Sequence, residues 1–169
     1  MPVVILPAYS LKNKDWAEQI KAELETHVPT RVIYWPHWET GKSEAGWIES
    51  QANKILDLVS EEKIDLLAKS VGTLVAMEML KIKPDKIGKI LLCGIPLNDF
   101  LEADQKRFDV LSDIQSGRVL IIQNENDNHA KFGDVKNLIE KVNSSIKIIS
   151  KPRSDHEYPY TEDFIKFFV

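Results

Sequence analysis

Short runs of apolar residues alternate along this chain with longer segments in which apolar positions recur at helical spacing. The short runs are continuous, which is typical of strands that are covered on both faces of a sheet. We expect six strands, over residues 3–6, 31–35, 64–68, 90–93, 119–123 and 146–149.

Four of the longer segments carry an apolar stripe along one predicted helix face. The stripes are Trp16, Ile20 and Leu24; Ile48, Ala52, Ile55, Leu56 and Val59; Val71, Leu74, Val75 and Leu80; and Val135, Leu138, Ile139 and Val142. A short closing helix is expected over residues 163–169, and residues 99–114 show a weaker, partly helical pattern. This alternation predicts an α/β fold, a parallel sheet with helices on both faces and right-handed crossovers.

The loops that follow the strands are where function is expected, because parallel sheets bind ligands beyond the carboxyl ends of their strands. Within the third such loop, the sequence Ala68-Lys69-Ser70-Val71-Gly72 joins a predicted strand to a predicted helix. A serine on so sharp a turn adopts a strained backbone, and small residues two positions away on each side relieve the crowding. The pattern indicates a nucleophile beside a helix N-terminus, which suits acyl transfer. A serine that only caps a buried helix is the alternative interpretation.

A serine nucleophile needs a base, and the chain has four histidines. His156 is the strongest candidate, because it lies in a polar turn between the last predicted strand and the last predicted helix. His27 closes the first predicted helix and is interpreted as a solvated residue. His37 is flanked by aromatic residues and is interpreted as part of a pocket wall. His129 stands too close in sequence to the best candidate acid to pair with it easily.

That acid is expected in the loop after the fifth strand. Asp127 is our choice there, with Glu125 as the rival, and a solvated turn carboxylate as the simpler interpretation. Ser70, Asp127 and His156 then follow three different strands, in the chain order of the α/β-hydrolase triad.

On these residues the chain resembles the α/β-hydrolase superfamily over nearly its full length. It is most similar to the small, lidless serine hydrolases of the YdeN type and to the related retinoblastoma-binding serine hydrolase. The first strand and loop, the early Trp16, the serine turn, and the loops with Asp127 and His156 carry the resemblance. Two residues depart from it: Ala8 replaces a usual glycine, and Lys69 stands where histidine or glutamine is common.

The resemblance implies a minimal α/β-hydrolase fold, a three-layer sandwich with strand order 2-1-3-4-5-6. It also implies that the backbone N–H groups of Tyr9 and Val71 form an oxyanion hole. No insertion is long enough for a full cap, although residues 96–114 are placed to fold partly over the site.

These features predict a serine hydrolase that cleaves a small carboxylic ester or thioester through an acyl-enzyme on Ser70. Two alternatives remain: an inactive binding protein of this fold, for which Ala8 and Lys69 argue, and an acyltransferase with the same triad. Aromatic residues near the same edge are candidates for the substrate pocket: His37, Trp38 and Tyr158, with Tyr9, Trp47 and Phe100 nearby. Trp47 and Phe100 are more readily interpreted as packing under loops.

Composition adds limits to this interpretation. The 169 residues favour one domain over 1–169, and 43% hydrophobic and 28% charged residues are ordinary for a globular protein. A net charge of −4 gives no reason to expect nucleic acid or membrane as partner. The expected partner is the small-molecule ester or thioester substrate, and the sequence does not indicate an oligomeric state. The lone Cys93 forbids an internal disulfide. With neither a signal peptide nor a membrane span in the pattern, we expect a cytoplasmic protein.

Cofactor motifs are missing from the sequence. Gly41-Lys42-Ser43 resembles the end of a phosphate loop, but the upstream glycine is absent at the required spacing, and no Gly-x-Gly-x-x-Gly occurs. The histidines and the cysteine show no metal-ligand spacing. We therefore expect neither a cofactor nor a metal.

Overall fold

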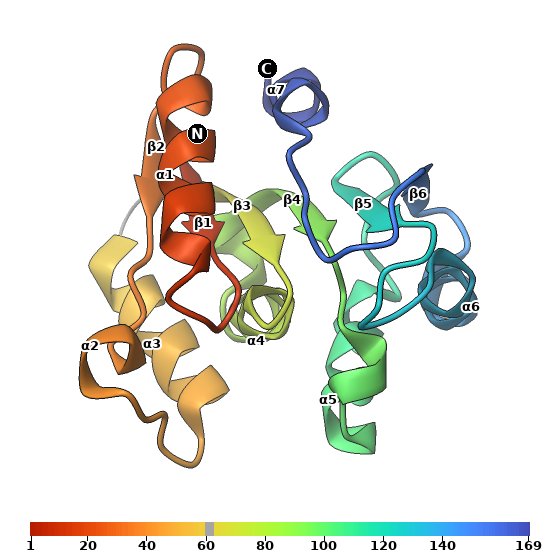
Figure 1. Ribbon diagram of the computed structural model, residues 1–169, viewed down its shortest axis with the longest axis horizontal. Helices are drawn as coiled ribbons and strands as arrows, with labels where there is room; N and C mark the ends of the chain where they lie inside the picture. Colours follow the sequence, from red (N-terminus) through yellow and green to blue (C-terminus); the bar gives the residue numbers. More distant parts are fainter. Residues whose placement is uncertain (60–62) are drawn as a thin grey trace.

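The computed structural model describes residues 1–59 and 63–169, and it shows a six-stranded parallel sheet (Figure 1). The strand order β2-β1-β3-β4-β5-β6 confirms the order predicted from the sequence. The strands are β1 (Val3–Leu6), β2 (Thr30–Val32), β3 (Ile64–Lys69), β4 (Ile87–Cys93), β5 (Val119–Asn124) and β6 (Lys147–Lys151). All neighbouring strands run parallel, with Leu6 opposite Ala68 and Lys69 opposite Cys93 in register.

Helices cover both faces of this sheet (Figure 1). On one face lie α1 (Asn13–Leu24) and α7 (Thr161–Phe168). On the other lie α3 (Trp47–Val59), α4 (Gly72–Ile82) and α6 (Phe132–Asn143). The strands in between are therefore buried on both sides, which is why their sequences are apolar runs without alternation.

The second strand is shorter than the pattern predicts. Pairing with β1 ends at Val32, and the apolar residues beyond it do not continue the strand. Trp35 instead packs under the first loop, where its Nε1–H donates to the carbonyl oxygens of Pro7 and Ala8 at 3.1 and 3.2 Å. The short helix α2 (His37–Thr40) follows and is capped by Gly41, whose φ of 77° is left-handed.

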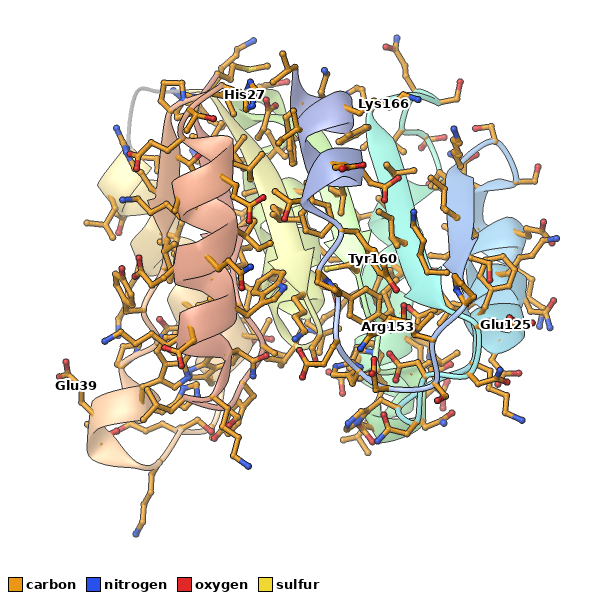
Figure 2. All side chains as sticks on the ribbon, turned by 45° about the horizontal axis from the view of Figure 1, so that its top comes forward. His27, Glu39, Glu125, Arg153, Tyr160 and Lys166 are labelled. Carbon is orange, nitrogen blue, oxygen red and sulfur yellow. The ribbon has the colours of Figure 1, made fainter. Side chains whose placement is uncertain are left out.

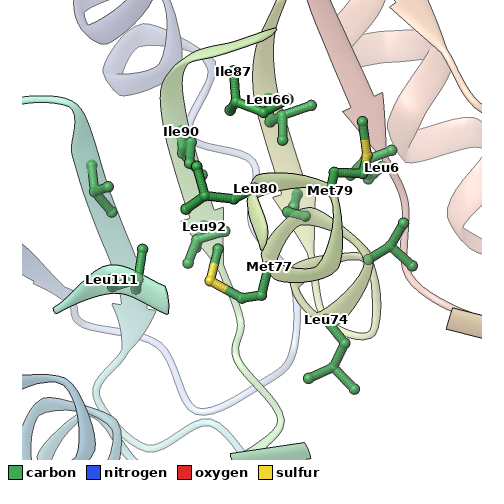
Figure 3. Packing of buried hydrophobic residues seen from close by; sticks show 14 of the residues in the cluster. Leu6, Leu66, Leu74, Met77, Met79, Leu80, Ile87, Ile90, Leu92 and Leu111 are labelled. Carbon is green, nitrogen blue, oxygen red and sulfur yellow. The ribbon is translucent and has the colours of Figure 1, made fainter. Parts of the chain in front are cut away.

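An apolar core fills each side of the sheet. Figure 3 shows the side chains of α4, including Met77 and Leu80, packed toward Leu92 of β4 and Leu111. On the opposite face, Ile20 of α1 and Phe164 of α7 pack against strand residues such as Leu67. Full burial stabilises the fold by about 1.5–3 kcal/mol for each large apolar side chain.

The segment after β4 crosses the carboxyl edge of the sheet on its way to β5. It contains η2 (Leu97–Asp99), α5 (Glu102–Lys106) and η3 (Arg107–Leu111). The guanidinium of Arg107 forms ion pairs with Glu78 of α4, at 2.5 Å, and with Glu49 of α3. These pairs, together with the buried Phe108, fasten the segment to the body of the molecule.

The carboxyl ends of the strands form one polar end of the molecule. In Figure 2, Glu125 and Arg153, which follow β5 and β6, lie at this end, and His27 and Lys166 lie at the other. Across residues 1–59 and 63–169, no helix combines the length and apolar character needed to cross a membrane.

Candidate active site

Ser70 occupies the tight turn between β3 and α4, and it has a left-handed backbone with φ of 55°. This conformation is strained for a residue with a side chain, and the surrounding hydrogen bonds hold it. The N–H of Ser70 donates to the carbonyl oxygen of Cys93 at 3.0 Å. Its own carbonyl oxygen accepts from the N–H of Thr73 at 2.9 Å and from the Thr73 hydroxyl at 2.6 Å.

Gly72 explains the need for a small residue after the serine. A Cβ on Gly72 would lie 2.2 Å from the carbonyl oxygen of Leu6 and 2.8 Å from that of Pro7. Only glycine lets the first turn of α4 approach the end of β1 so closely. This approach brings the amide of Val71 next to the loop that carries Tyr9.

Asp127 and His156 meet across the loops that follow β5 and β6. Asp127 is 2% exposed, and its Oδ2 lies 2.7 Å from Nδ1 of His156 and 2.6 Å from the Tyr158 hydroxyl, which donates to it. Its Oδ1 accepts from the backbone N–H of His129 at 2.8 Å. Burial raises the pKa of the Asp127 carboxyl, but these three hydrogen bonds outweigh burial and lower the pKa below its ordinary value.

The other ring nitrogen of His156 is left available. Nε2 is buried and has no hydrogen-bond partner in the part of the chain that the structure describes. The ring sits against Gly94, where a Cβ would come within 3.1 Å of its Cε1 and 2.6 Å of the Tyr158 ring. An acidic partner on Nδ1 and a vacant Nε2 are the features of a general base.

Ser70 and His156 face the same open cavity of about 480 Å³. Its walls are formed by Ala8, Tyr9, Ser10, Asn13, Ile48, Ser70, Val71, Leu74, Pro96, Asp99, Phe100, Asp104, His129 and His156. Hollows of about 260 to 480 Å³ also occur elsewhere on the described surface, so volume alone does not select this one. What selects it is that the strained serine, a histidine with an unpartnered Nε2 and the amides of Tyr9 and Val71 converge there.

Solved structures share this architecture. A serine hydrolase without a lid from Xanthomonas campestris matches at 13% identity and a TM-score of 0.67, covering 98% of this chain and 77% of that one. Est1E from Butyrivibrio proteoclasticus with ferulic acid bound matches at 14% identity and a TM-score of 0.74, covering 98% and 87%. A serine hydrolase homologue from Coxiella burnetii matches at 16% identity and a TM-score of 0.71, covering 100% and 85%.

The chain has the α/β-hydrolase fold. No family model and no curated protein matches its sequence.

In α/β-hydrolases the second oxyanion donor comes from the strand–helix loop called β3–αA in the complete fold. In this shorter sheet the matching loop follows β1, the strand next to β3. Here Tyr9 and Val71 both line the cavity, and neither amide donates a hydrogen bond within the described residues. The Tyr9 carbonyl oxygen accepts from Nε1 of Trp38 and lies close to Nε2 of His37, at 2.7 Å in each case. The Tyr9 ring also stacks on His37 at 4.1 Å between centroids.

Those contacts change the roles assigned to the pocket residues. His37 and Trp38 lie behind the cavity wall and hold the Tyr9 loop, whereas the prediction placed them on the wall. Tyr158 is fully buried beneath Asp127 and does not line the cavity. The aromatic residues do gather at the carboxyl edge of the sheet, as predicted. Their pattern does not distinguish residues that line the cavity from residues that pack behind the lining.

Two residues that the sequence reasoning did not assign to the cavity form part of its wall. Nδ1 of His129 lies 2.6 Å from Oδ2 of Asp99, and the His129 and His156 rings are 4.3 Å apart between centroids. Asp99 belongs to the segment that crosses the carboxyl edge, which also contributes Phe100 to the wall. Their position after two strand ends was the available signal, but the pairing depends on the path of residues 96–111.

Among the described residues, no group of three or more histidine, cysteine, aspartate and glutamate side chains is arranged to hold a metal ion. Cys93 is buried at the end of β4, and its burial raises the pKa of the thiol to about 12. A thiol in this state is a poor nucleophile at neutral pH.

Proposed function

We propose that this chain is a serine hydrolase that cleaves a small carboxylic ester or thioester through an acyl-enzyme on Ser70. One observation carries the proposal: a single cavity is lined by the strained serine and by a histidine whose far nitrogen is bound to a buried carboxylate. The solved structures of the same fold include serine hydrolases, which supports this reading at the level of the fold.

In the proposed reaction, the hydroxyl of Ser70 attacks the substrate carbonyl while Nε2 of His156 accepts its proton. Asp127 keeps the proton on Nδ1 and stabilises the imidazolium. The amides of Tyr9 and Val71 donate to the oxyanion, and each such donor is worth roughly 10²–10³ in rate. His156 then protonates the leaving group. In the second half of the reaction, His156 takes a proton from water as the water attacks the acyl carbonyl, and then returns that proton to the Ser70 oxygen as the acid leaves.

No hydrogen bond joins Ser70 to His156 in the described residues, where Nε2 has no partner. In enzymes without substrate, such bonds are often long and tighten only in the substrate complex. The open cavity favours small substrates, since residues 96–111 cover it only in part.

The test is labelling with a fluorophosphonate probe and hydrolysis of p-nitrophenyl acetate. We expect the wild type to be labelled on Ser70, as mapped by peptide mass spectrometry, and the Ser70→Ala variant to lose both labelling and turnover. Ser145→Ala, on an exposed turn after α6, is the matched control and should retain both.

An unlabelled wild type, or an active Ser70→Ala variant, would overturn the proposal. Product analysis with added alcohols separates a hydrolase from an acyltransferase, because a hydrolase yields the free acid as its main product.

A further inference from the structure

Lys69 directly precedes the serine and is almost completely buried, with 1% of its side chain exposed. It ends β3, and its side chain lies on the face of the sheet that α1 and α7 cover, as its neighbour two residues before, Leu67, does. The proposed chemistry gives this ammonium group no role. A buried charge costs free energy unless partners compensate it, so its contacts are informative.

The ammonium group contacts two different loops of the site. Its Nζ donates to Oδ1 of Asn13 at 2.9 Å, at the start of α1. It lies 3.6 Å from Oε2 of Glu157, the residue after His156. It also lies 5.0 Å from the centre of the Trp16 ring, a cation–π contact.

Each partner is tied to a catalytic loop. The backbone N–H and the side-chain amide of Asn13 both donate to the carbonyl oxygen of Ser10, at 2.9 and 3.1 Å, and Ser10 directly follows Tyr9. The indole N–H of Trp16 donates to the carbonyl oxygen of Tyr158 at 2.9 Å. Lys69 therefore stands where the oxyanion loop and the histidine loop meet the strand that carries the nucleophile.

We propose that Lys69 is a positioning residue that holds the Tyr9 loop and the His156 loop in register with Ser70. This inference rests on the function proposed above and adds how its parts are aligned. Glu157 is 63% exposed, so its ion pair with Lys69 alone stabilises the fold little. The contact matters because it positions the loops: displacing a catalytic group by about 1 Å can lower the rate by about 10²-fold.

The decisive variant is Lys69→Met, which keeps an unbranched side chain only one atom shorter and removes the charge and the hydrogen bond. Lys89→Met is the matched control, because Lys89 also donates to a carbonyl, that of Phe167, and lies 5.7 Å from its ring, but near the opposite end of the sheet. We expect Lys69→Met to lower kcat and the fluorophosphonate labelling rate by about 10- to 100-fold with little change in KM. Lys89→Met should leave all three values unchanged.

Hydrogen–deuterium exchange tests the tether independently of activity. In Lys69→Met, we expect faster exchange in residues 7–12 and in residues 153–160, whereas Lys89→Met should change neither segment. Unchanged exchange in both segments, or an unchanged kcat, would overturn the inference. A wild type that is not labelled overturns the proposed function instead, so the two failures are distinguishable.

Glu157→Gln provides a second test if Lys69→Met does not fold, because its exposed side chain is not needed for the core. It weakens only the contact between Lys69 and the histidine loop, because it removes the carboxylate charge and keeps an acceptor oxygen. We expect faster exchange confined to residues 153–160 and a fall in kcat of a few-fold, about the effect of one weakened contact. Equal exchange and equal kcat in this variant and the wild type would contradict the proposed positioning role.

Discussion

The imidazole of His129 lies against that of His156, with ring centroids 4.3 Å apart, and each ring is paired with a carboxylate of its own. The two pairs differ in their surroundings. Asp127 is buried and accepts three hydrogen bonds, whereas the side chain of Asp99 is 56% exposed. A carboxylate held by several donors in a buried position orients its histidine more firmly than an exposed one. The geometry therefore favours His156 as the base, and His129 as a residue that only lines the cavity.

The first prediction separates these two histidines. We expect His156→Ala to abolish hydrolysis of p-nitrophenyl acetate. His129→Ala should reduce it by less than about tenfold, because it is the backbone amide of His129 that supports Asp127. The larger cavity of His129→Ala should also raise the rate on p-nitrophenyl butyrate relative to acetate. If His129→Ala were inactive and His156→Ala active, the base would have to be reassigned to His129.

The second prediction concerns the stability of the fold against pH. The pKa of Asp127 is lower in the folded chain than its ordinary value near 4, so the folded state binds fewer protons there than the unfolded state. Its ionised form therefore stabilises the fold at pH values above about 4, and this contribution is lost as the pH falls through the lowered pKa. Asp127→Asn removes the charge, and we expect it to cost about 2 kcal/mol of unfolding free energy at pH 7.

Urea unfolding of both proteins between pH 7 and pH 3 measures this effect. The difference in unfolding free energy between wild type and Asp127→Asn should shrink toward the acid end of the range. A difference that stays constant with pH would show that the Asp127 charge does not contribute to stability.

The third prediction concerns the close approach at Gly72. A methyl group there would meet the backbone of Leu6 and Pro7, which cannot yield without moving the end of β1. We expect Gly72→Ala to destabilise the fold by roughly 3 kcal/mol and to displace the Val71 amide, with loss of labelling. Gly133→Ala is the control, because Gly133 lies in helix α6 with open space around its Cβ position.

In the control, the smaller backbone entropy of the unfolded chain should stabilise the protein by about 0.5–1 kcal/mol. Thermal unfolding of both variants measures the changes, and at this chain length 1 kcal/mol corresponds to about 2–4 °C in Tm. A Gly72→Ala variant as stable as the wild type would show that the approach of α4 to β1 can relax.

The sheet could be predicted from the sequence because its strands are buried on both faces and read as continuous apolar runs. Strand order followed from the family resemblance, and the first strand matched residue for residue. Element ends were less accurate. Apolar residues after Val32 extend the hydrophobic run, but Trp35 is buried by a loop contact rather than by pairing in the sheet. An apolar run alone does not distinguish residues buried in a paired strand from residues buried under a loop.

The candidate site shows the same division. Ser70, Asp127 and His156 were chosen because each follows a strand end, and the fold brings these ends to one edge. His37, Trp38 and Tyr158 were predicted to line the cavity, but they lie behind residues that do. How deep a side chain lies behind a loop depends on the path of that loop, which the sequence pattern does not specify. The Asp99–His129 pair depends on the path of residues 96–111, which local periodicity does not specify.

Arg107 has a consequence for how substrates arrive. Its guanidinium is bound by carboxylates of two separate helices, so moving the segment over the cavity would break both ion pairs and take from the buried Glu78 its arginine partner. We therefore expect the entrance to keep its shape as substrate binds, with no separate opening step. Substrate saturation should then be simple and hyperbolic, and dispersing the substrate in micelles should bring no sudden gain in rate.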